Sequence, residues 1–241
     1  MSLPSLSIII PALNEEVLLS TLLSTIQQQT ISPEIIVADA HSIDATREVA
    51  QRFGARVVEG GLPAVGRNAG AELATGEWIL FLDADVVLPD SFFLERMLNE
   101  LARTKWDCVT ADIVPMSERR YDRFSFWVYN RYVRLWGARR AHAPGFFILV
   151  RRSFHKKIGC FNESVVFCED HEYAQRAAKA GRFGFLNSVK VQTSVRRFDK
   201  DGRFTIAWKF LAAELHLLIK GPIYDDKFHY RFGYGDDARK K

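Results

Sequence analysis

The sequence is poor in cysteine, and the few it has form no framework. Its 241 residues include three cysteines, Cys108, Cys160 and Cys168, an odd number without the spacing of a metal-binding motif. A disulfide-stapled secreted fold is therefore not indicated. The amino end also lacks the basic segment of a signal peptide, and Pro11 soon interrupts its apolar run. We expect a reducing, cytoplasmic location.

Long apolar runs and a strong net charge are missing as well. No uninterrupted apolar segment is long enough to span a bilayer. A net charge of +4 is too weakly basic to indicate nucleic-acid binding, but it suits an anionic small molecule or an anionic membrane surface. With 241 residues, of which 48% are hydrophobic, the chain is long enough for one large domain with a sizeable core. It has no repeat, low-complexity tract or linker that would divide it.

The first half alternates between strand and helix patterns. Short β-branched runs predict strands, and segments with apolar residues at helical spacing predict the helices between them. Strands separated by single helices imply parallel pairing with right-handed crossovers. We therefore expect an α/β fold with a Rossmann-like, mostly parallel sheet flanked by helices. The expected strands are 6–13, 34–40, 55–60 and 77–85, and the expected helices are 14–29, 44–54 and 64–76.

The second half is less regular. A capped helix at 90–104 precedes a strand at 107–114, and an aromatic and arginine-rich segment occupies 124–140. Further on, a strand at 145–152 and an acidic turn into a helix at 168–181 complete the pattern. These elements predict one domain over 1–200 and a C-terminal helical appendage over 201–241.

Polar side chains follow the predicted strands of the first half. Asn14 and Glu15 follow the first strand, Asp39 ends the second, and Asp83 and Asp85 end the fourth. Ligands of parallel α/β sheets bind at the carboxyl ends of the strands. We therefore expect these side chains to converge on one crevice.

Asp83 and Asp85 stand one residue apart after an apolar strand. Like charges this close repel, and each resists ionising beside the other. Hard oxygen ligands of this kind hold divalent cations, which would offset the repulsion, and we expect Mn²⁺ or Mg²⁺. Capping of the turn after the strand is the alternative.

Several motifs in order carry a family resemblance: "PALNEE", "VADAHSIDAT", "GRNAGAELATGEWILFLDAD", then "GCFNE" and "CEDHEYAQRAAKAG". Over roughly residues 5–185 the chain resembles a family 2 glycosyltransferase of the GT-A fold. The resemblance implies a nucleotide-diphosphate sugar donor, a divalent cation and, commonly, inversion of the anomeric centre. It departs from the family pattern at Ala40 and His41, where small or glycine residues are frequent.

The resemblance also implies roles for individual residues. In the family pattern Asp39 contacts the nucleobase, Arg67 lies near the nucleotide, and Asp83 and Asp85 form the DxD motif. The second aspartate of that motif usually ligates the metal. Asp170 of the "ED" pair is the implied catalytic base.

Neighbouring residues complete the expected site. Pro11, Asn14, Glu15 and Ala84 join the nucleotide-sugar-binding set, and Glu169 orients the base or binds an acceptor hydroxyl. A sugar leaving as a diphosphate develops negative charge that a metal stabilises, and a hydroxyl attacks well only after a carboxylate removes its proton.

Each assignment has a structural alternative. Asp39 could form an Asx-turn, Asn14 could only cap the first helix, and Arg67 could be a solvated helix residue. Asp170 and Glu169 could likewise only cap their helix.

Two other functions compete with an inverting glycosyltransferase. A nucleotidyltransferase would need a glycine-rich loop after the first strand, and "PALNEE" has no glycine. A non-catalytic nucleotide-sugar-binding module remains open, although intact Asp83, Asp85 and Asp170 argue against it.

The segment 203–220 predicts an amphipathic helix with an unusually wide apolar face. A basic stripe and Trp208 accompany that face, and Glu214 is the one acidic residue that interrupts it. Such a helix lies in a membrane surface, with the segment 124–140 as a second contact. The protein would then be peripheral on the inner face of the membrane, with a lipid-linked acceptor. Packing on the sheet or a homodimer contact are the alternatives.

Overall fold

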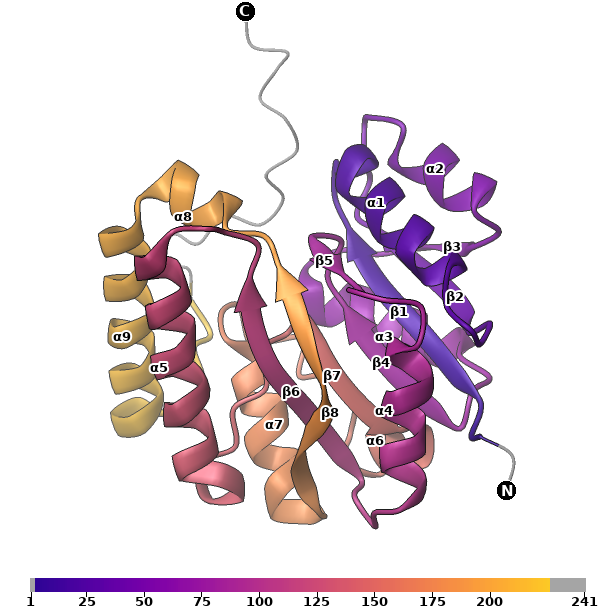
Figure 1. The fold of residues 1–241 in the computed structure, drawn as a ribbon. Coiled ribbons are helices and arrows are strands. Elements are labelled where there is room, and N and C mark those ends of the chain that lie inside the picture. Colours follow the sequence, from indigo (N-terminus) through magenta and orange to yellow (C-terminus); the bar gives the residue numbers. More distant parts are fainter. Residues whose placement is uncertain (1–2, 226–241) are drawn as a thin grey trace, which may run out of the picture.

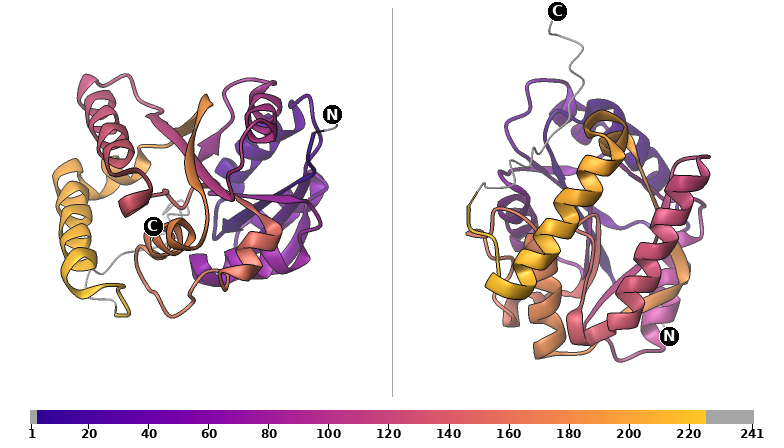
Figure 2. Two further views of the ribbon diagram at one scale, coloured as in Figure 1. Left: turned by 90° about the horizontal axis from the view of Figure 1, so that it is seen from below. Right: turned by 90° about the vertical axis from the view of Figure 1, so that its left-hand side faces the viewer.

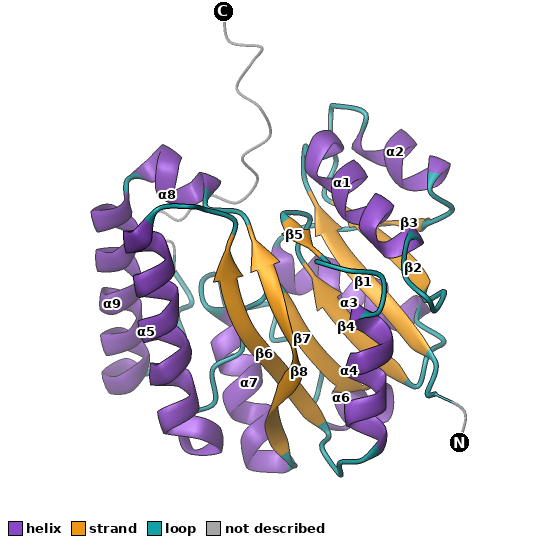
Figure 3. Cartoon of the chain, viewed as in Figure 1, coloured by secondary structure: helices purple, strands orange, loops and turns teal. Residues whose placement is uncertain are grey.

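The computed structural model describes residues 3–225, which form one sheet with helices on both faces (Figure 1, Figure 3). The strands are β1 Leu6–Ala12, β2 Glu34–Asp39, β3 Arg56–Glu59, β4 Trp78–Leu82, β5 Val86–Val87, β6 Cys108–Pro115, β7 Phe147–Arg151 and β8 Phe183–Thr193. The helices are α1 Glu16–Gln27, α2 Thr46–Arg52, α3 Pro63–Leu73, α4 Phe93–Ala102, α5 Arg120–Trp136, η1 Gly137–Arg140 (a 3₁₀ turn), α6 Arg152–Lys157, α7 Glu169–Ala180, α8 Arg196–Asp201 and α9 Arg203–Lys220.

The strands run in the order β3-β2-β1-β4-β7-β6-β8-β5. β1 to β4 pair in parallel, as their intervening helices predict, and Ala12 lies opposite Asp39 at the carboxyl ends of β1 and β2. β7 is antiparallel to both of its neighbours, β4 and β6, and β5 is antiparallel to β8. β6 and β8 pair in parallel. Four of the seven pairings within residues 3–225 are thus parallel, which confirms the predicted mostly parallel α/β sheet.

The sheet is buried on both faces. Successive β1 side chains alternate between two core clusters, so that Ile8 and Ile10 join one and Ile9 the other. Helices α1 and α4 supply the first cluster with residues such as Leu22 and Met97. On the opposite face α3, α6 and α7 supply residues such as Tyr173. This two-sided burial explains why the strands read as continuous apolar runs.

Strands β5 and β8 were not among the predicted elements, and together they fix the turn after β4. Val86 of β5 pairs with Thr193 of β8, and the backbone N–H of Ser194 donates to the carbonyl oxygen of Asp85 at 3.0 Å. The turn that carries Asp83 and Asp85 is therefore held by β4 on one side and by the last strand on the other.

Helices α5 and α9 lie side by side beyond the sheet (Figure 2). Helix α9 is the described part of the predicted C-terminal appendage, of which residues 226–241 lie outside the described residues. Only Ile206 and Ala213 of α9 are buried, so burial against the sheet does not explain its apolar pattern. None of the described helices is long and apolar enough to cross a membrane.

Candidate active site

Arg67 of α3 connects the two halves of the site. Its side chain is almost fully buried, and Nη2 donates to Asp83 Oδ1 at 3.1 Å while Nη1 donates to Glu169 Oε1 at 2.6 Å. The alternative that Arg67 is a solvated helix residue is therefore wrong. The buried guanidinium holds the carboxylates that follow β4 close to those that open α7.

Asp85 occupies a crowded acidic environment. Burial, followed by the neighbouring charges of Asp83 and Glu15, raises the pKa of Asp85 to about 7, against the pull of Arg196. Glu15 forms an ion pair with Arg196, yet burial raises its pKa too. Ala84, between the two aspartates, is buried. Carboxylate oxygens held beside like charges, as those of Asp85 are beside Asp83, are ligands that suit a hard divalent cation such as Mn²⁺ or Mg²⁺.

Asp170 lies in the first turn of α7 rather than just before the helix. Its Oδ2 accepts from the backbone N–H of Gly145 at 2.7 Å, and its Oδ1 accepts from the backbone N–H of His171 at 2.8 Å. Burial raises the pKa of Asp170, and the nearby Arg67 opposes that rise. The carboxyl group is thus held in a fixed orientation with its proton affinity increased.

Gly145 is a site residue that the sequence reasoning missed. A Cβ at this position would lie 2.5 Å from Arg67 Nη2 and 3.2 Å from Asp170 Oδ2, so no larger side chain fits without displacing one of them. The signal in the sequence is the glycine of "APGFF", directly before β7. A glycine at the start of a strand is equally typical of an ordinary turn, so this signal does not single out a site by itself.

Glu169 lies against Arg67 and is 6% exposed. Burial raises its pKa, and the arginine opposes that rise. Of the two roles expected for Glu169, this position favours orienting the site over binding an acceptor hydroxyl.

The second strand places Asp39 in a fully buried position. Its Oδ2 accepts from Arg47 Nη1 at 3.0 Å and from the backbone N–H of Ser42 at 3.2 Å, as in the Asx-turn alternative. Its Oδ1 is buried and has no hydrogen-bond partner among residues 3–225. Buried acceptors are almost always paired, so this oxygen is open to a donor from a ligand or a water molecule.

Asn14 does not cap the first helix. Helix α1 begins at Glu16 without a side-chain cap, and Asn14 adopts a left-handed backbone with φ 54°. Its Oδ1 instead accepts from the backbone N–H of Ile43 at 2.8 Å. Asn14 therefore ties the loop after β1 to the loop after β2. Pro11 lies in β1 opposite Ala38 of β2, next to these loops.

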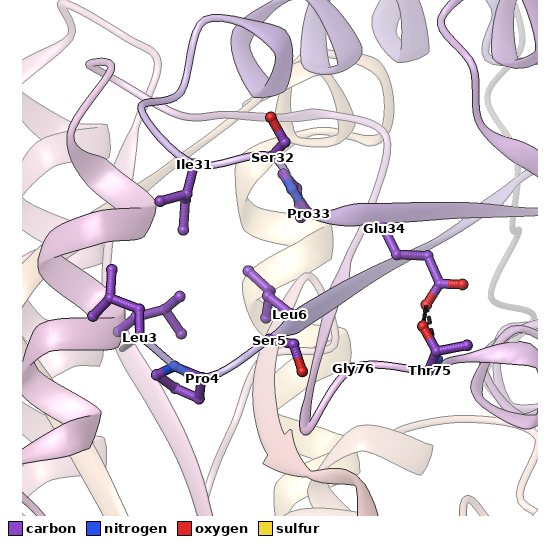
Figure 4. Close-up of a pocket in the computed structure, with 11 residues that line it drawn as sticks. Leu3, Pro4, Ser5, Leu6, Ile31, Ser32, Pro33, Glu34, Thr75 and Gly76 are labelled. Atoms are coloured by element: carbon purple, nitrogen blue, oxygen red, sulfur yellow. Dashed lines mark hydrogen bonds between the residues drawn. The ribbon is translucent and has the colours of Figure 1, made fainter. Parts of the chain in front are cut away.

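A shallow cavity of about 300 Å³ lies at the other edge of the sheet (Figure 4). It is formed by the segments at the amino ends of β1 and β2 and before β4, and its polar residue Glu34 is engaged by the backbone N–H of Thr75 at 2.8 Å. None of the predicted site residues lines this cavity, so the carboxyl edge remains the candidate active site.

Comparison with known proteins identifies the class. The family model described as Glycosyl transferase family 2 matches residues 7–159, more than half of the chain. The chain therefore belongs to glycosyl transferase family 2, as its motifs predicted.

Solved structures confirm the GT-A fold. The mannosyltransferase PcManGT from Pyrobaculum calidifontis, in complex with GDP-Man and Mn²⁺, superposes with a TM-score of 0.71 at 21% identity, over 95% of this chain and 68% of that one. S. aureus TarS 1–349 in complex with UDP-GlcNAc gives a TM-score of 0.66 at 19% identity, over 88% of this chain and 66% of that one.

Curated relatives are similar over parts of their length. Glycosyltransferase AglE of Haloferax volcanii is 27% identical over 199 residues, which cover 75% of this chain and 63% of AglE. The 4,4'-diaponeurosporenoate glycosyltransferase of Staphylococcus haemolyticus is 36% identical over 111 residues, 42% of this chain and 30% of the relative. The chain thus spans less than two thirds of either protein.

Proposed function

We propose that this chain is an inverting glycosyltransferase that moves a sugar from a nucleotide-diphosphate donor to an acceptor hydroxyl. The observation that carries the proposal is the buried guanidinium of Arg67, which lies between Asp83, the neighbour of Asp85, and the Glu169–Asp170 pair. Metal-type carboxylates and a separate, oriented carboxylate are the two parts that such a reaction needs.

The acceptor side of the reaction falls to Asp170. As the acceptor oxygen attacks the anomeric carbon, its proton passes to the Asp170 carboxylate. The new carbon–oxygen bond forms on the face opposite the leaving diphosphate, whose own bond to that carbon breaks. The raised pKa of Asp170 improves it as a proton acceptor, and the Gly145 N–H keeps it aimed.

The donor side falls to the residues after β1, β2 and β4. Asp83 and Asp85 would hold Mn²⁺ or Mg²⁺, which supplies positive charge to the diphosphate. The unpartnered Oδ1 of Asp39 would accept an N–H of the nucleobase. Pro11, Asn14, Glu15 and Ala84 line the same loops. PcManGT and TarS, which share the fold, bind GDP-Man and UDP-GlcNAc, and this supports a nucleotide-diphosphate sugar as the donor.

The surface of α5 and α9 supports a lipid-linked acceptor. Large apolar side chains on both helices are exposed: Phe124, Trp127, Val128, Leu135, Trp136, Phe204, Trp208, Leu211, Leu215, Leu218 and Ile219. Arginines such as Arg123 and Arg131 accompany them on α5. We infer that this α5–α9 surface rests on the cytoplasmic leaflet and presents the acceptor to Asp170. A homodimer through the same surface is the competing explanation.

Substitution of Asp170 tests the function. Asp170→Asn keeps the shape of the side chain but removes its proton affinity. We expect donor binding to persist and sugar transfer to fall by about 10²–10⁴-fold. Donor turnover measured with UDP-, GDP- and dTDP-sugars in the presence of Mn²⁺, together with a thermal-shift assay for donor binding, checks both parts.

Glu172→Gln is the matched control, because Glu172 lies in the same turn of α7 but pairs with Arg176 through bonds of 2.8 Å to its Nε and Nη2. This variant should retain transfer. Near-normal turnover in Asp170→Asn would contradict the assignment of the base. Donor binding by the wild-type protein without turnover would instead support the non-catalytic nucleotide-sugar-binding module.

A further inference from the structure

A second cluster of polar side chains lies outside the carboxylate site. It consists of His142 before β7, His171 in the first turn of α7, and Glu214 in the middle of α9, and we call it the histidine cluster. One ring nitrogen of each histidine and one carboxylate oxygen of Glu214 lie within 4.8 Å of one another. The two imidazole rings contact edge to face at a centroid distance of 4.6 Å. Three segments far apart in the sequence thus meet here.

One ring nitrogen of each histidine is buried without a hydrogen bond. His142 is 1% exposed, and its Nε2 and the Nδ1 of His171 are both buried without a hydrogen bond among residues 3–225. Burial lowers the pKa of both imidazoles, that of His142 to about 4, so both are neutral at pH 7 and each ring has one nitrogen with a lone pair. Two adjacent unpaired ring nitrogens are costly unless something binds them.

Glu214 already forms an ion pair with an arginine side chain. Its Oε1 accepts from Arg140 Nη2 at 2.8 Å and from the Tyr132 hydroxyl at 2.9 Å, and it lies 3.5 Å from His142 Nε2. These contacts explain the acidic residue within the apolar pattern of α9, because its side chain points inward. Arg140 therefore already balances the charge of this carboxylate, and an ion bound here would compete with that guanidinium for Glu214.

We propose that the histidine cluster binds one Zn²⁺ ion through His142, His171 and Glu214. Two neutral imidazoles and a carboxylate, with water as the fourth ligand, suit Zn²⁺ better than Mg²⁺ or Ca²⁺, which prefer oxygen ligands alone. Tetrahedral coordination with bonds of about 2.0 Å requires ligand atoms about 3.3 Å apart. The three atoms, which lie within 4.8 Å of one another, would have to approach by at most about 1.5 Å to reach that distance.

The ion would fasten α9 to the catalytic helix. His171 directly follows Asp170 in α7, and His142 precedes Gly145, whose N–H holds Asp170. Zinc would therefore link the α5–α9 surface to the position of Asp170 without taking part in the transfer. The binding of the ion does not depend on the proposed sugar transfer, so the two can be tested separately.

Metal titration of the full chain, prepared without a histidine tag, tests the site. Apart from any ion held by Asp83 and Asp85, we expect one equivalent of Zn²⁺ to bind and Co²⁺ to give the visible absorption of a tetrahedral complex. His142→Gln and Glu214→Gln should each weaken the affinity for Zn²⁺ by about 10–100-fold or more. His41→Gln, which removes an exposed histidine on a different loop, should leave the affinity unchanged.

Arg140→Gln gives a result in the opposite direction. It removes the competing guanidinium, so Zn²⁺ should bind more tightly than in the wild-type protein, an effect that no folding defect produces. Asp85→Asn separates this site from the DxD motif, and zinc binding should persist in it. Equal affinity in wild type, His142→Gln and Glu214→Gln would overturn the proposal. Loss of zinc binding in Asp85→Asn would also overturn it, by placing the ion at the carboxylates.

Discussion

At the scale of single residues, the positions of the charged side chains in the site depend on the space that a neighbouring glycine leaves for them. Arg67 lies between Asp83 and Glu169, and its close approach to Asp170 requires a neighbour without a side chain, Gly145. The sequence displays the charged residues plainly, but it does not display the space that they require.

Gly145→Ala should reduce turnover strongly. Its new methyl group would meet Arg67 Nη2 and Asp170 Oδ2, and a shift of either by about 1 Å costs on the order of 100-fold in rate. Steady-state kinetics, with a melting curve to confirm folding, measure this effect. Gly61→Ala is the control, because its methyl group would meet only the Val65 side chain, at 3.2 Å. Equal activity in both variants would show that the close approach at Gly145 is unimportant.

Asp85 predicts a pH dependence of cation binding. Because its pKa is raised to about 7 when folded, a proton competes with the metal below pH 7. Affinity for Mn²⁺ should therefore rise by about tenfold per pH unit up to pH 7 and then level off. Titration calorimetry between pH 5 and pH 8.5 measures the profile, and an affinity independent of pH would contradict it.

The same shift affects stability in the absence of metal. A carboxyl group whose folded pKa is raised stabilises the native state at low pH, and that contribution is lost as the pH rises through about 7. Glu15 and Asp170 act in the same direction. The difference in unfolding free energy between wild type and Asp85→Asn isolates the contribution of Asp85. As the pH rises from 4 to 7, the wild type should lose stability relative to Asp85→Asn.

At the scale of elements, patterns predicted helices and strands better than they predicted what those elements contact. The strands of the first half were confirmed because continuous apolar runs bounded by turns specify buried parallel strands. β8 was missed because the exposed residues Asn187, Ser188 and Lys190 in its middle interrupt the apolar pattern. The inward direction of Glu214 was missed as well, because its partners Arg140 and Tyr132 lie on other elements.

The α5–α9 surface predicts binding to anionic membranes. Trp208 and Leu211 are 62% and 51% exposed, and a charge at either position would enter the headgroup region. Liposome flotation should show binding that weakens with salt and that drops in Trp208→Glu and Leu211→Glu. Phe92→Glu, at an exposed apolar residue before α4, is the control and should bind as the wild type does. A protein that never floats and runs as a dimer through α9 would support the homodimer instead.

At the scale of the whole molecule, the fold followed from the sequence, and so did the place of the candidate site. Parallel strands bring their carboxyl ends together, so the strand pattern alone assigns Glu15, Asp39 and Asp85 to one edge of the sheet. The partners of the site could not be assigned in this way. The pairing of Arg67 with Glu169 and the insertion of β7 in the antiparallel sense depend on how the second half folds back, which local patterns do not encode.

That folding back has a consequence for the order of synthesis. The turn bearing Asp85 is closed by Thr193 and Ser194, and Arg67 obtains its second partner only from α7. A chain emerging from the ribosome can pair β1 to β4 early, since their contacts are close in sequence. The repulsion between Asp83 and Asp85 is then not offset by the later partners until β8 has emerged. We therefore expect the proposed sugar transfer to begin only after the chain has been translated through β8.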